Sequence, residues 1–374
     1  MMTTKAIGLY LHIPFCVRKC NYCDFCSFSI SSADWREAYV NRLCEEIGSY
    51  KEQNIMLNSI FFGGGTPSLL TTNEFEKIVD AIKGSFMILP DCEFTIEANP
   101  KTLDEEKLRA FVECGVNRLS IGLQSIHENE LKILGRIHSF DDFLESYKMA
   151  RACGIENINI DLMYGIPEQT MDSFEETLHR IIDLNPEHIS LYGLILEEGT
   201  PFYAIKDSLD LPAEDSECDM YYLAAKVLSS AGYSHYEISN YAKPEYHCRH
   251  NLKYWRCEEY IGVGLAAYSY FDGRRFANTD NTQEYLKSGW TKYDCQDVLS
   301  VADLAYEYVM LGLRLAEGFS PEEYKSRFSA DFLEGRANII DKFLRAGYIT
   351  LKNGRIALTE SGFYVSNSII NELI

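Results

Sequence analysis

The chain has 374 residues and carries 35 Lys and Arg against 56 Asp and Glu, a formal net charge of −21. This acidic balance argues against non-specific binding to nucleic acid or to an anionic membrane, because both need clustered basic side chains. Hydrophobic residues make up 46% of the sequence, which allows one large domain or two with a packed core. Twelve cysteines without a secretory signal indicate a reducing, cytoplasmic compartment. No apolar run approaches the ~20 residues of a membrane span, so membrane contact would be peripheral, through a partner.

Short apolar runs alternate with amphipathic segments through the first half of the chain. Trp35, Tyr39, Leu43 and Ile47 recur every four residues, which predicts an amphipathic helix. The same reasoning predicts strands at 7–15, 58–62, 93–97, 117–122, 157–162 and 188–192, and helices at 74–85, 104–114, 140–153 and 172–184. This alternation is typical of a parallel sheet with right-handed crossovers. About six such units make a partial TIM-like barrel, although the pattern by itself does not separate it from a doubly wound sheet.

The regular alternation ends after residue 192, and the chain is predicted to divide into three parts, 1–235, 236–300 and 301–374. A further helix is predicted at 214–231. The last part shows a helix from Val301, a helix start at Ser320-Pro321, and a hairpin around Asn353-Gly354. This order resembles a small winged-helix module of the α+β type. Its eight Lys and Arg against ten Asp and Glu favour a lid or docking surface over DNA binding.

Three cysteines follow the first predicted strand at close spacing, Cys16, Cys20 and Cys23. Disulfides would need an oxidising compartment. A closed structural zinc site needs a fourth ligand. Cys26 could be that ligand only if the chain formed a third short loop in the same turn. Iron–sulfur clusters are usually held by four cysteines. Three thiolates would hold three irons of a cubane and leave the fourth iron open to another ligand, which makes a reactive centre.

Polar residues stand at the ends of several predicted strands. In parallel α/β folds ligands lie outside the carboxyl ends of the strands, so these residues are expected to meet at the rim that carries the cysteines. Taken singly, each is an ordinary turn or a solvated carboxylate, and no Lys-Ser or Lys-Thr pair follows the glycines, which excludes a Walker loop. The residues are Gly64, Gly65, Thr66, Glu97, Gln124 and Asp161.

The cysteine spacing, preceded by Tyr10-x-His12-Ile13-Pro14-Phe15, resembles the radical S-adenosylmethionine (SAM) superfamily, in particular its porphyrin-handling branch. The resemblance implies a (β/α)6 partial barrel and a [4Fe–4S] cluster on Cys16, Cys20 and Cys23, whose open iron chelates SAM. It implies that the reduced cluster passes one electron to the sulfonium, releasing methionine and a 5′-deoxyadenosyl radical, so an electron donor is an expected partner. It also implies these SAM contacts: Tyr10, Tyr22, Gly64, Gly65, Thr66, Glu97, Gln124, Arg136 and Asp161.

Two families of that branch compete, the oxygen-independent coproporphyrinogen III dehydrogenases and the HemW-type haem chaperones. The dehydrogenases carry a fourth cysteine two residues after the third, and an N-terminal arm. Here Phe25 stands at that position, Cys26 follows one step late, and only fifteen residues precede Cys16. Cys23-Asp24-Phe25 and the segments 236–241 and 250–255 instead resemble the chaperones. The expected function is therefore a haem chaperone, with the dehydrogenase and a structural zinc protein as alternatives.

Under the chaperone interpretation, His250 in His250-Asn251-x-x-Tyr254-Trp255 is a candidate haem ligand, since a neutral imidazole suits haem iron. Tyr254 and Trp255 would supply a flat apolar wall. Without the resemblance, His250 is more simply a hydrogen-bonded packing residue. Many relatives carry a His where Tyr268 stands, so a second imidazole ligand is not expected. The expected partners are haem and haem-accepting apoproteins, respiratory enzymes among them, and a homodimer is compatible with the sequence.

Overall fold

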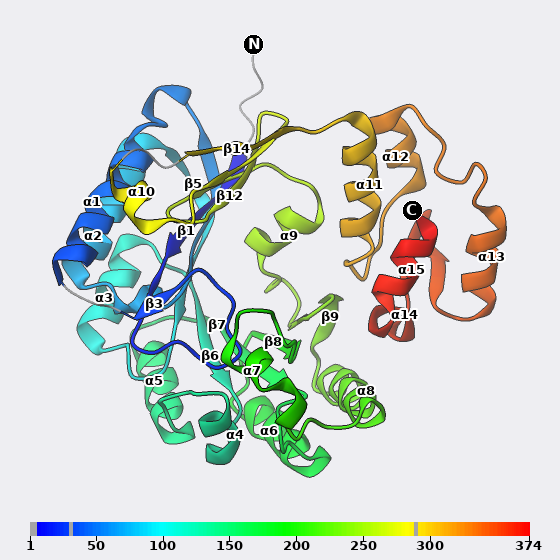
Figure 1. The fold of residues 1–374 in the computed structure, drawn as a ribbon, viewed down its shortest axis with the longest axis horizontal. Helices are drawn as coiled ribbons and strands as arrows, with labels where there is room; N and C mark the ends of the chain where they lie inside the picture. The colour runs from blue at the N-terminus through cyan, green and yellow to red at the C-terminus, as the bar shows by residue number, and fades with distance from the viewer. Residues whose placement is uncertain (1–5, 30–32, 288–290) are drawn as a thin grey trace.

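A computed structural model describes residues 6–29, 33–287 and 291–374 (Figure 1). Its framework is a sheet that contains twelve strands within those residues. From one edge to the other these are β14 (Thr291–Val298), β13 (Arg274–Asn278), β12 (Tyr268–Phe271), β11 (Tyr260–Val263), β1 (Ala6–Ile13), β4 (Met56–Gly64), β5 (Met87–Ala98), β6 (Arg118–Gln124), β7 (Asn157–Tyr164), β8 (His188–Gly193), β10 (Asn240–Ala242) and β9 (Ser234–Glu237).

The middle of the sheet is parallel. Strands β1, β4, β5, β6, β7 and β8 pair in chain order, and each pairing is parallel. These are the six strands predicted from the apolar runs, so the predicted α/β class with a parallel sheet is confirmed. Strand β11 adds a further parallel strand beside β1, with Tyr10 opposite Gly262.

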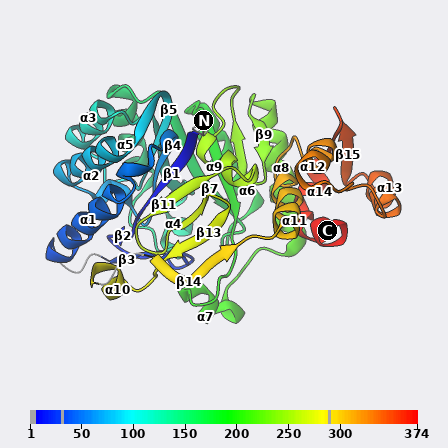
Figure 2. The same ribbon diagram turned by 90° about the horizontal axis from the view of Figure 1, so that it is seen from above.

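Helices cover the outer face of the parallel strands, as Figure 2 shows from above. They are α1 (Ala33–Gly48), α2 (Thr72–Ser85), α3 (Glu105–Cys114), α4 (Glu128–Ile133), α5 (Phe140–Ala152), α6 (Met171–Asp183) and α8 (Glu214–Ser230). Capping boxes begin α2 at Thr71, α5 at Ser139 and α6 at Thr170, because each side chain accepts from a backbone N–H of the first turn. The short helix α4 has no counterpart in the predicted elements.

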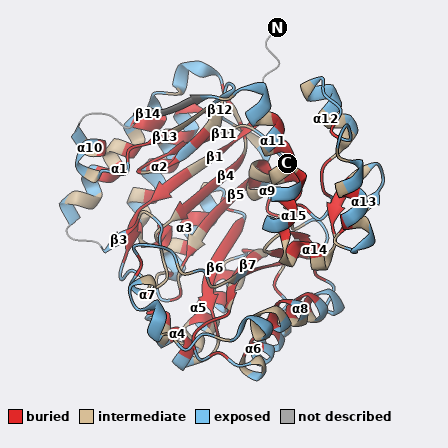
Figure 3. Cartoon of the chain, turned by 45° about the vertical axis from the view of Figure 1, so that its right-hand side comes forward, coloured by how far each residue is buried: buried red, intermediate tan, exposed pale blue. Residues whose placement is uncertain are grey.

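Each parallel strand places apolar side chains on one face and polar ones on the other. On β5, Phe94 and Ile96 join the hydrophobic core under the helices, whereas Glu97 lines an internal cavity. On β6, Ile121 belongs to the core and Ser120 to the cavity wall. Figure 3 shows these strands as the buried centre of the molecule. A barrel interior usually packs branched apolar residues, so the carboxyl, hydroxyl and aromatic groups on this inner face mark a binding chamber rather than a second core.

The segment predicted to connect the two domains adds strands to both edges of the sheet. Strand β10 pairs antiparallel with β8, and β12, β13 and β14 continue antiparallel from β11. Helix α9 (Arg249–Trp255) packs beside β4, and the Glu93 carboxylate in the middle of β5 accepts from the backbone N–H of Arg249 and of His250, each at 2.9 Å. This contact holds His250 next to the barrel interior.

The C-terminal part, orange to red in Figure 1, has a hydrophobic core of its own around Phe319, Ile356 and Phe363. The predicted hairpin is present as β15 (Ile349–Lys352) and β16 (Arg355–Leu358), with α14 (Glu360–Tyr364) and α15 (Ser366–Leu373) in place of one last helix. Three helices precede it: α11 (Val301–Gly312), α12 (Pro321–Phe328) and α13 (Ala337–Arg345).

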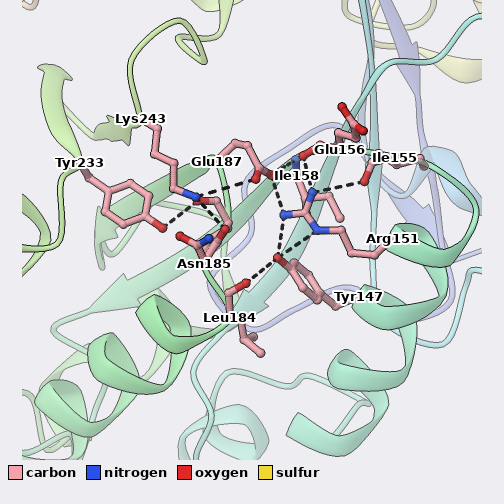
Figure 4. Close-up of polar contacts among 11 residues, drawn as sticks. Tyr147, Arg151, Ile155, Glu156, Ile158, Leu184, Asn185, Glu187, Tyr233 and Lys243 are labelled. Carbon is pink, nitrogen blue, oxygen red and sulfur yellow. Dashed lines mark hydrogen bonds and ion pairs between the residues drawn. The ribbon is translucent and has the colours of Figure 1, made fainter.

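A polar cluster ties together the amino ends of β7 and β8, at the end of the barrel opposite the predicted site (Figure 4). The Glu187 carboxylate accepts from Arg151 Nη2 at 2.6 Å and from the Ile158 backbone N–H at 3.1 Å. Arg151 also donates to the Tyr147 hydroxyl, which donates to the Leu184 carbonyl. Contacts at this end of a barrel serve stability, because the ligand sites of such folds lie at the other end. In the parts of the chain that the structure describes, no helix combines the length and apolar character needed to cross a membrane.

Candidate functional site

The three cysteines lie on the loop that follows β1. The loop is closed at its base by a short parallel pairing of β2 (Phe15–Cys16) with β3 (Phe28–Ser29), and by the Phe28 N–H donating to the Pro14 carbonyl at 2.8 Å. The ring Nε2 of His12, on β1, lies 2.7 Å from the Cys26 carbonyl oxygen. A short chain segment is thereby held in one conformation before any cofactor binds.

Asn21 fixes the tip of this loop to distant parts of the chain. Its backbone N–H donates to the Leu134 carbonyl at 3.0 Å and its side-chain amide donates to the Ile133 carbonyl at 2.8 Å. Its own carbonyl accepts from the Phe202 N–H, on the short helix α7 (Pro201–Ala204), at 3.0 Å. The loop is therefore positioned by the end of α4 and by α7, neither of which was predicted.

Cys16, Cys20 and Cys23 line one cavity of about 410 Å³, the cysteine cavity, at the carboxyl ends of the strands. Two of the sulfurs have donors beside them: the Thr66 hydroxyl lies 3.8 Å from Cys16 Sγ, and Arg136 Nη1 lies 3.6 Å from Cys20 Sγ. Burial raises the pKa of the Cys23 thiol. Donors aimed at sulfur favour the thiolate form that metal centres require.

Within the described residues, no three His, Cys, Asp or Glu side chains are gathered as the ligands of a single metal ion. This applies to the cysteine loop and to the group His247, Cys248 and His250. The ligands of one zinc ion share one metal, whereas the cysteines of a cubane each bind a different iron and stand farther apart. Three thiols around one cavity, with donors beside two of them, fit a cluster better than a closed zinc site.

Most of the predicted SAM contacts meet at the cysteine cavity. Tyr10 lies instead on the wall of the neighbouring cavity, and Thr66 is buried beneath the loop against Cys16. The residues that line the cysteine cavity are Tyr22, Gly64, Gly65, Glu97, Gln124, Arg136 and Asp161. The rim expected from the strand ends therefore exists, although the positions were far apart in sequence.

Arg136 is held at the cavity wall with one donor left over. Its Nη2 donates to the Asn99 side-chain oxygen at 2.5 Å and to the Gly122 carbonyl, and its Nη1 faces Cys20. Its Nε is buried and has no hydrogen-bond partner among the described residues. A buried N–H without a partner is costly, so this atom is suited to a ligand carboxylate.

Close packing explains the two predicted cavity glycines. A Cβ on Gly65 would lie 2.6 Å from the Phe15 carbonyl oxygen, and one on Gly64 would lie 2.6 Å from the His12 ring. Gly64 also has a φ of +111°, a conformation that favours glycine. Because both residues lack a Cβ, the end of β4 packs directly against β1 and the start of the cysteine loop. The Gly64 N–H then donates to the Glu97 carboxyl at 3.1 Å.

Gln124 is in a left-handed conformation, with a φ of +75°. It ends β6, where the pairing with β7 shifts register between Gly122 and Gln124. This conformation costs a non-glycine residue roughly 1–2 kcal/mol. Strain of this kind persists where the surrounding structure requires it, and it concentrates at binding sites. Here it accompanies a side chain that lines the cysteine cavity.

Two largely enclosed carboxyl groups, Glu97 and Asp161, line the boundary of the cysteine cavity. Burial and the nearby Asp161 charge raise the pKa of Glu97 to about 8, so at pH 7 Glu97 is mostly protonated. Burial also raises the pKa of Asp161, opposed by hydrogen bonds from Asn159 and Ser120 at 2.7 and 3.2 Å. An incoming cation would release this proton, since it stabilises both carboxylates.

A second cavity of about 580 Å³, the barrel cavity, shares Glu97, Asp161 and Tyr192 with the cysteine cavity. It extends into the barrel interior, where Tyr10, Phe61 and His250 form an aromatic wall. The two cavities thus give one ligand at the cysteines direct access to a second ligand inside the barrel.

Curated relatives match the chain along its whole length. A protein of Lactococcus lactis named "Heme chaperone HemW" is 34% identical over 376 residues, covering 100% of this chain and 98% of its own. The Escherichia coli protein of the same name is 34% identical, covering 99% of this chain and 98% of its own. The chain belongs to the HemW family.

Models of known families agree with this. Residues 10–181 match the model of the Radical SAM superfamily, and residues 299–365 match that of the HemN C-terminal domain. Membership of the radical SAM superfamily implies a [4Fe–4S] cluster and SAM. The solved structure of coproporphyrinogen III oxidase (HemN) from Escherichia coli has a TM-score of 0.84, covering 98% of this chain and 90% of that one. At 22% identity, this likeness shows the fold: a partial barrel with a small C-terminal domain.

The HemW-like segment 250–255 places His250 on the barrel cavity, but both of its ring nitrogens are occupied. Nδ1 lies 3.0 Å from the Ser59 hydroxyl and Nε2 lies 2.8 Å from the Tyr254 hydroxyl. Burial, with the charges of Lys253 and Arg118, lowers the pKa of His250 to about 3, so the imidazole is neutral. Trp255 lies away from the barrel cavity, against the C-terminal part.

Sequence reasoning missed several residues that line the two cavities. Asn99 positions Arg136 and also donates to the Thr66 hydroxyl at 2.8 Å. Tyr192 contributes to both cavities, and Arg118 lies in the wall of the barrel cavity. Asn99 follows Glu97 closely in sequence, so its place at a strand end was a usable signal. Nothing in the sequence marks Arg118, because it begins its strand.

Proposed function

We propose that the chain is a radical SAM haem chaperone, which binds a [4Fe–4S] cluster, SAM and haem and delivers haem to acceptor proteins. The observation that carries this proposal is the full-length similarity to several proteins named "Heme chaperone HemW". The paired cavities support it, because one offers thiols and the other a larger aromatic chamber.

In this proposal Cys16, Cys20 and Cys23 would hold the cluster. When bound, the cluster supplies one-electron chemistry next to SAM. The Arg136 Nε would donate to the SAM carboxylate, since it is the unused donor of a fixed guanidinium. The Glu97 and Asp161 carboxylates would accept from the amino and ribose hydroxyl groups.

Gly64 and Gly65 would bring bare backbone next to the methionine part of SAM, and Gln124 would supply an amide at the same wall. Tyr22 would lie beside the adenine. Burial is the main cause that raises the pKa of Tyr22, and the charges of Cys20, Cys23 and Asp161 raise it further, which places its side chain close to these groups. Tyr10 and Thr66 would act from further away, Tyr10 from the barrel cavity and Thr66 through Cys16.

Haem is the proposed cargo of the barrel cavity. The His250 ring stacks with Phe61 at 5.2 Å between ring centroids, and Tyr254 meets it edge-on at 5.3 Å. These rings form an apolar surface suited to a porphyrin face. For His250 to bind iron, its Nε2 has to exchange the Tyr254 hydroxyl for the metal. The acceptor apoproteins, with an electron donor for the cluster, are the proposed partners.

The cysteines agree with a cytoplasmic protein in this proposal. The eleven cysteines whose side chains the structure describes are free, and free thiols persist in a reducing compartment. A membrane-bound acceptor would then be reached by a peripheral contact.

The second candidate function is oxygen-independent conversion of coproporphyrinogen III. The observation that favours it is the fold, since the HemN structure has a TM-score of 0.84 with this chain. Phe25, where those enzymes carry a cysteine, weighs against it. It predicts loss of two propionate carboxylates as CO2 in the presence of SAM and a reductant.

The deciding experiment is anaerobic reconstitution followed by measurement of iron, sulfide and haem in one sample. The chaperone proposal predicts a brown [4Fe–4S] protein that binds haem with a Soret band and does not convert coproporphyrinogen III. Zinc without sulfide would instead indicate the structural zinc protein. Absence of haem binding, or turnover of coproporphyrinogen, would remove the chaperone proposal.

A matched pair of variants tests the haem ligand separately. His250→Ala should weaken haem binding and shift the Soret band, whereas His179→Ala, at an exposed position on α6, should change neither. Unchanged haem spectra in His250→Ala would contradict the ligand assignment and leave the family assignment in place.

A further inference from the structure

Arg118 is a buried cation on the wall of the barrel cavity. It opens strand β6, is 2% exposed, and lies opposite Thr95 on β5 and Asn157 on β7. Its Nε has no hydrogen-bond partner among the described residues. Burying a charged group is costly unless it is paired and hydrogen-bonded. The fold therefore holds a buried cation at the cavity wall with a donor that the described residues leave unused.

The carboxyl groups close enough for charge interaction with Arg118 are Glu93, Asp161 and Glu97. Glu93 accepts from the backbone N–H groups of Arg249 and His250, where it holds the start of α9. Asp161 accepts from Asn159 and Ser120. Glu97 accepts from the Gly64 N–H, so each of the three carboxyl groups near Arg118 already has another donor.

The neutral polar groups nearby are satisfied by one another. Asn159 donates to Ser120 and to Asp161, and its side-chain oxygen accepts from Ser190 and faces His188 Nδ1. The two register neighbours of Arg118 each hold one buried oxygen without a hydrogen-bond partner among the described residues, the Thr95 hydroxyl and the Asn157 side-chain oxygen. The unmet hydrogen-bonding capacity of this region thus lies at Arg118 and at these two neighbours.

We propose that Arg118 is the anion-binding residue of the barrel cavity and takes a carboxylate of the ligand that fills it. On the proposed function, on which this inference rests, that group is a propionate of haem. An arginine presents a planar fork that matches a carboxylate. Arg118 is also close enough to His250 for its charge to lower the pKa of that imidazole. One haem could therefore meet the cation and the imidazole of the same cavity.

Each cavity then has a buried arginine for one carboxylate, and Arg18 is a second arginine on the wall of the cysteine cavity. Arg136 lines only the cysteine cavity and Arg118 only the barrel cavity. A carboxylate at Arg118 could come from haem or from an amino-acid ligand such as a SAM molecule, so the experiment has to separate these sources.

The test compares haemin with its dimethyl ester, in which both propionates are uncharged, on the cluster-reconstituted full-length protein. Wild-type protein should bind haemin about tenfold or more tighter than the ester, as expected for a charge-assisted hydrogen bond in a buried site. In Arg118→Gln this preference should fall to about twofold or less. Arg118→Lys should keep part of the preference, and Arg109→Gln, an exposed arginine on α3, should keep all of it.

The outcomes separate the inference from the proposed function. Equal binding of haemin and ester by the wild-type protein overturns the inference, even if Arg118→Gln fails to fold, and leaves haem binding standing. Failure of the wild-type protein to bind either compound overturns the proposed function. If Arg118→Gln keeps the preference for haemin but binds SAM more weakly, the carboxylate belongs to SAM and the inference is wrong.

Discussion

Replacing Glu97 with Gln should remove a large pH dependence from the stability of the cluster-free protein. Glu97 is buried between Tyr10, Asp161 and the Gly64 N–H, and burial and Asp161 raise its pKa from 4.5 to about 8. Because the folded-state pKa lies above the unfolded one, the folded protein binds this proton more tightly. The stabilisation is fully present below pH 4.5 and is lost as the pH rises to about 8.

The magnitude follows from the two pKa values. The difference between 4.5 and about 8, at 1.36 kcal/mol per pH unit, corresponds to about 5 kcal/mol of unfolding free energy. That is a large part of the ~5–15 kcal/mol stability of a typical domain. Glu46 and Glu237, whose pKa values burial raises to about 7, add their own slopes to both proteins. The informative quantity is therefore the difference between wild-type and Glu97→Gln protein.

Urea unfolding at pH 5.5 and at pH 9 measures this difference. Glu97→Gln should lose less unfolding free energy than the wild-type protein between the two pH values, by several kcal/mol, because an amide imitates the protonated carboxyl. Glu105→Gln, at an exposed position on α3, should parallel the wild type. If the Glu97→Gln and wild-type curves run parallel over this range, Glu97 is ionised at neutral pH and the electrostatic account of the site is wrong.

Three further predictions concern the loop and the opposite end of the barrel. Glu187→Gln should lower the unfolding free energy by about 1–3 kcal/mol, because it weakens the half-buried ion pair with Arg151; an unchanged urea midpoint would contradict this. Gly65→Ala should reduce iron incorporation on reconstitution, since a Cβ would lie 2.6 Å from the Phe15 carbonyl, and full iron content would show that the loop yields. Cys26→Ala should keep iron, sulfide and visible absorption, whereas Ala at any cysteine of the predicted triad should abolish them; loss in Cys26→Ala would make it a ligand.

Local sequence patterns determined the elements and much of the rim. The apolar runs predicted six parallel strands, and the cap residues Ser139 and Ser320 start helices where expected. These signals are reliable because strand alternation and helix capping depend on neighbours only a few residues away. The cysteine spacing and the strand-end glycines are also local patterns that the sequence shows directly. Most of the predicted SAM contacts line one cavity.

Only the tertiary structure decided how those residues are paired and which are left without partners. Asn21 reaches across to residues near 134, and Arg136 is held by Asn99 and Gly122, contacts that no local pattern encodes. His250 has both ring nitrogens occupied, while the Nε of Arg118, beside a cavity, finds no partner in the described parts of the chain. Hydrogen-bond satisfaction is a property of the packed interior, where water is excluded and each polar atom depends on groups from distant strands. The sequence therefore determined what chemistry the chain carries, and the fold decided which atoms remain free to perform it.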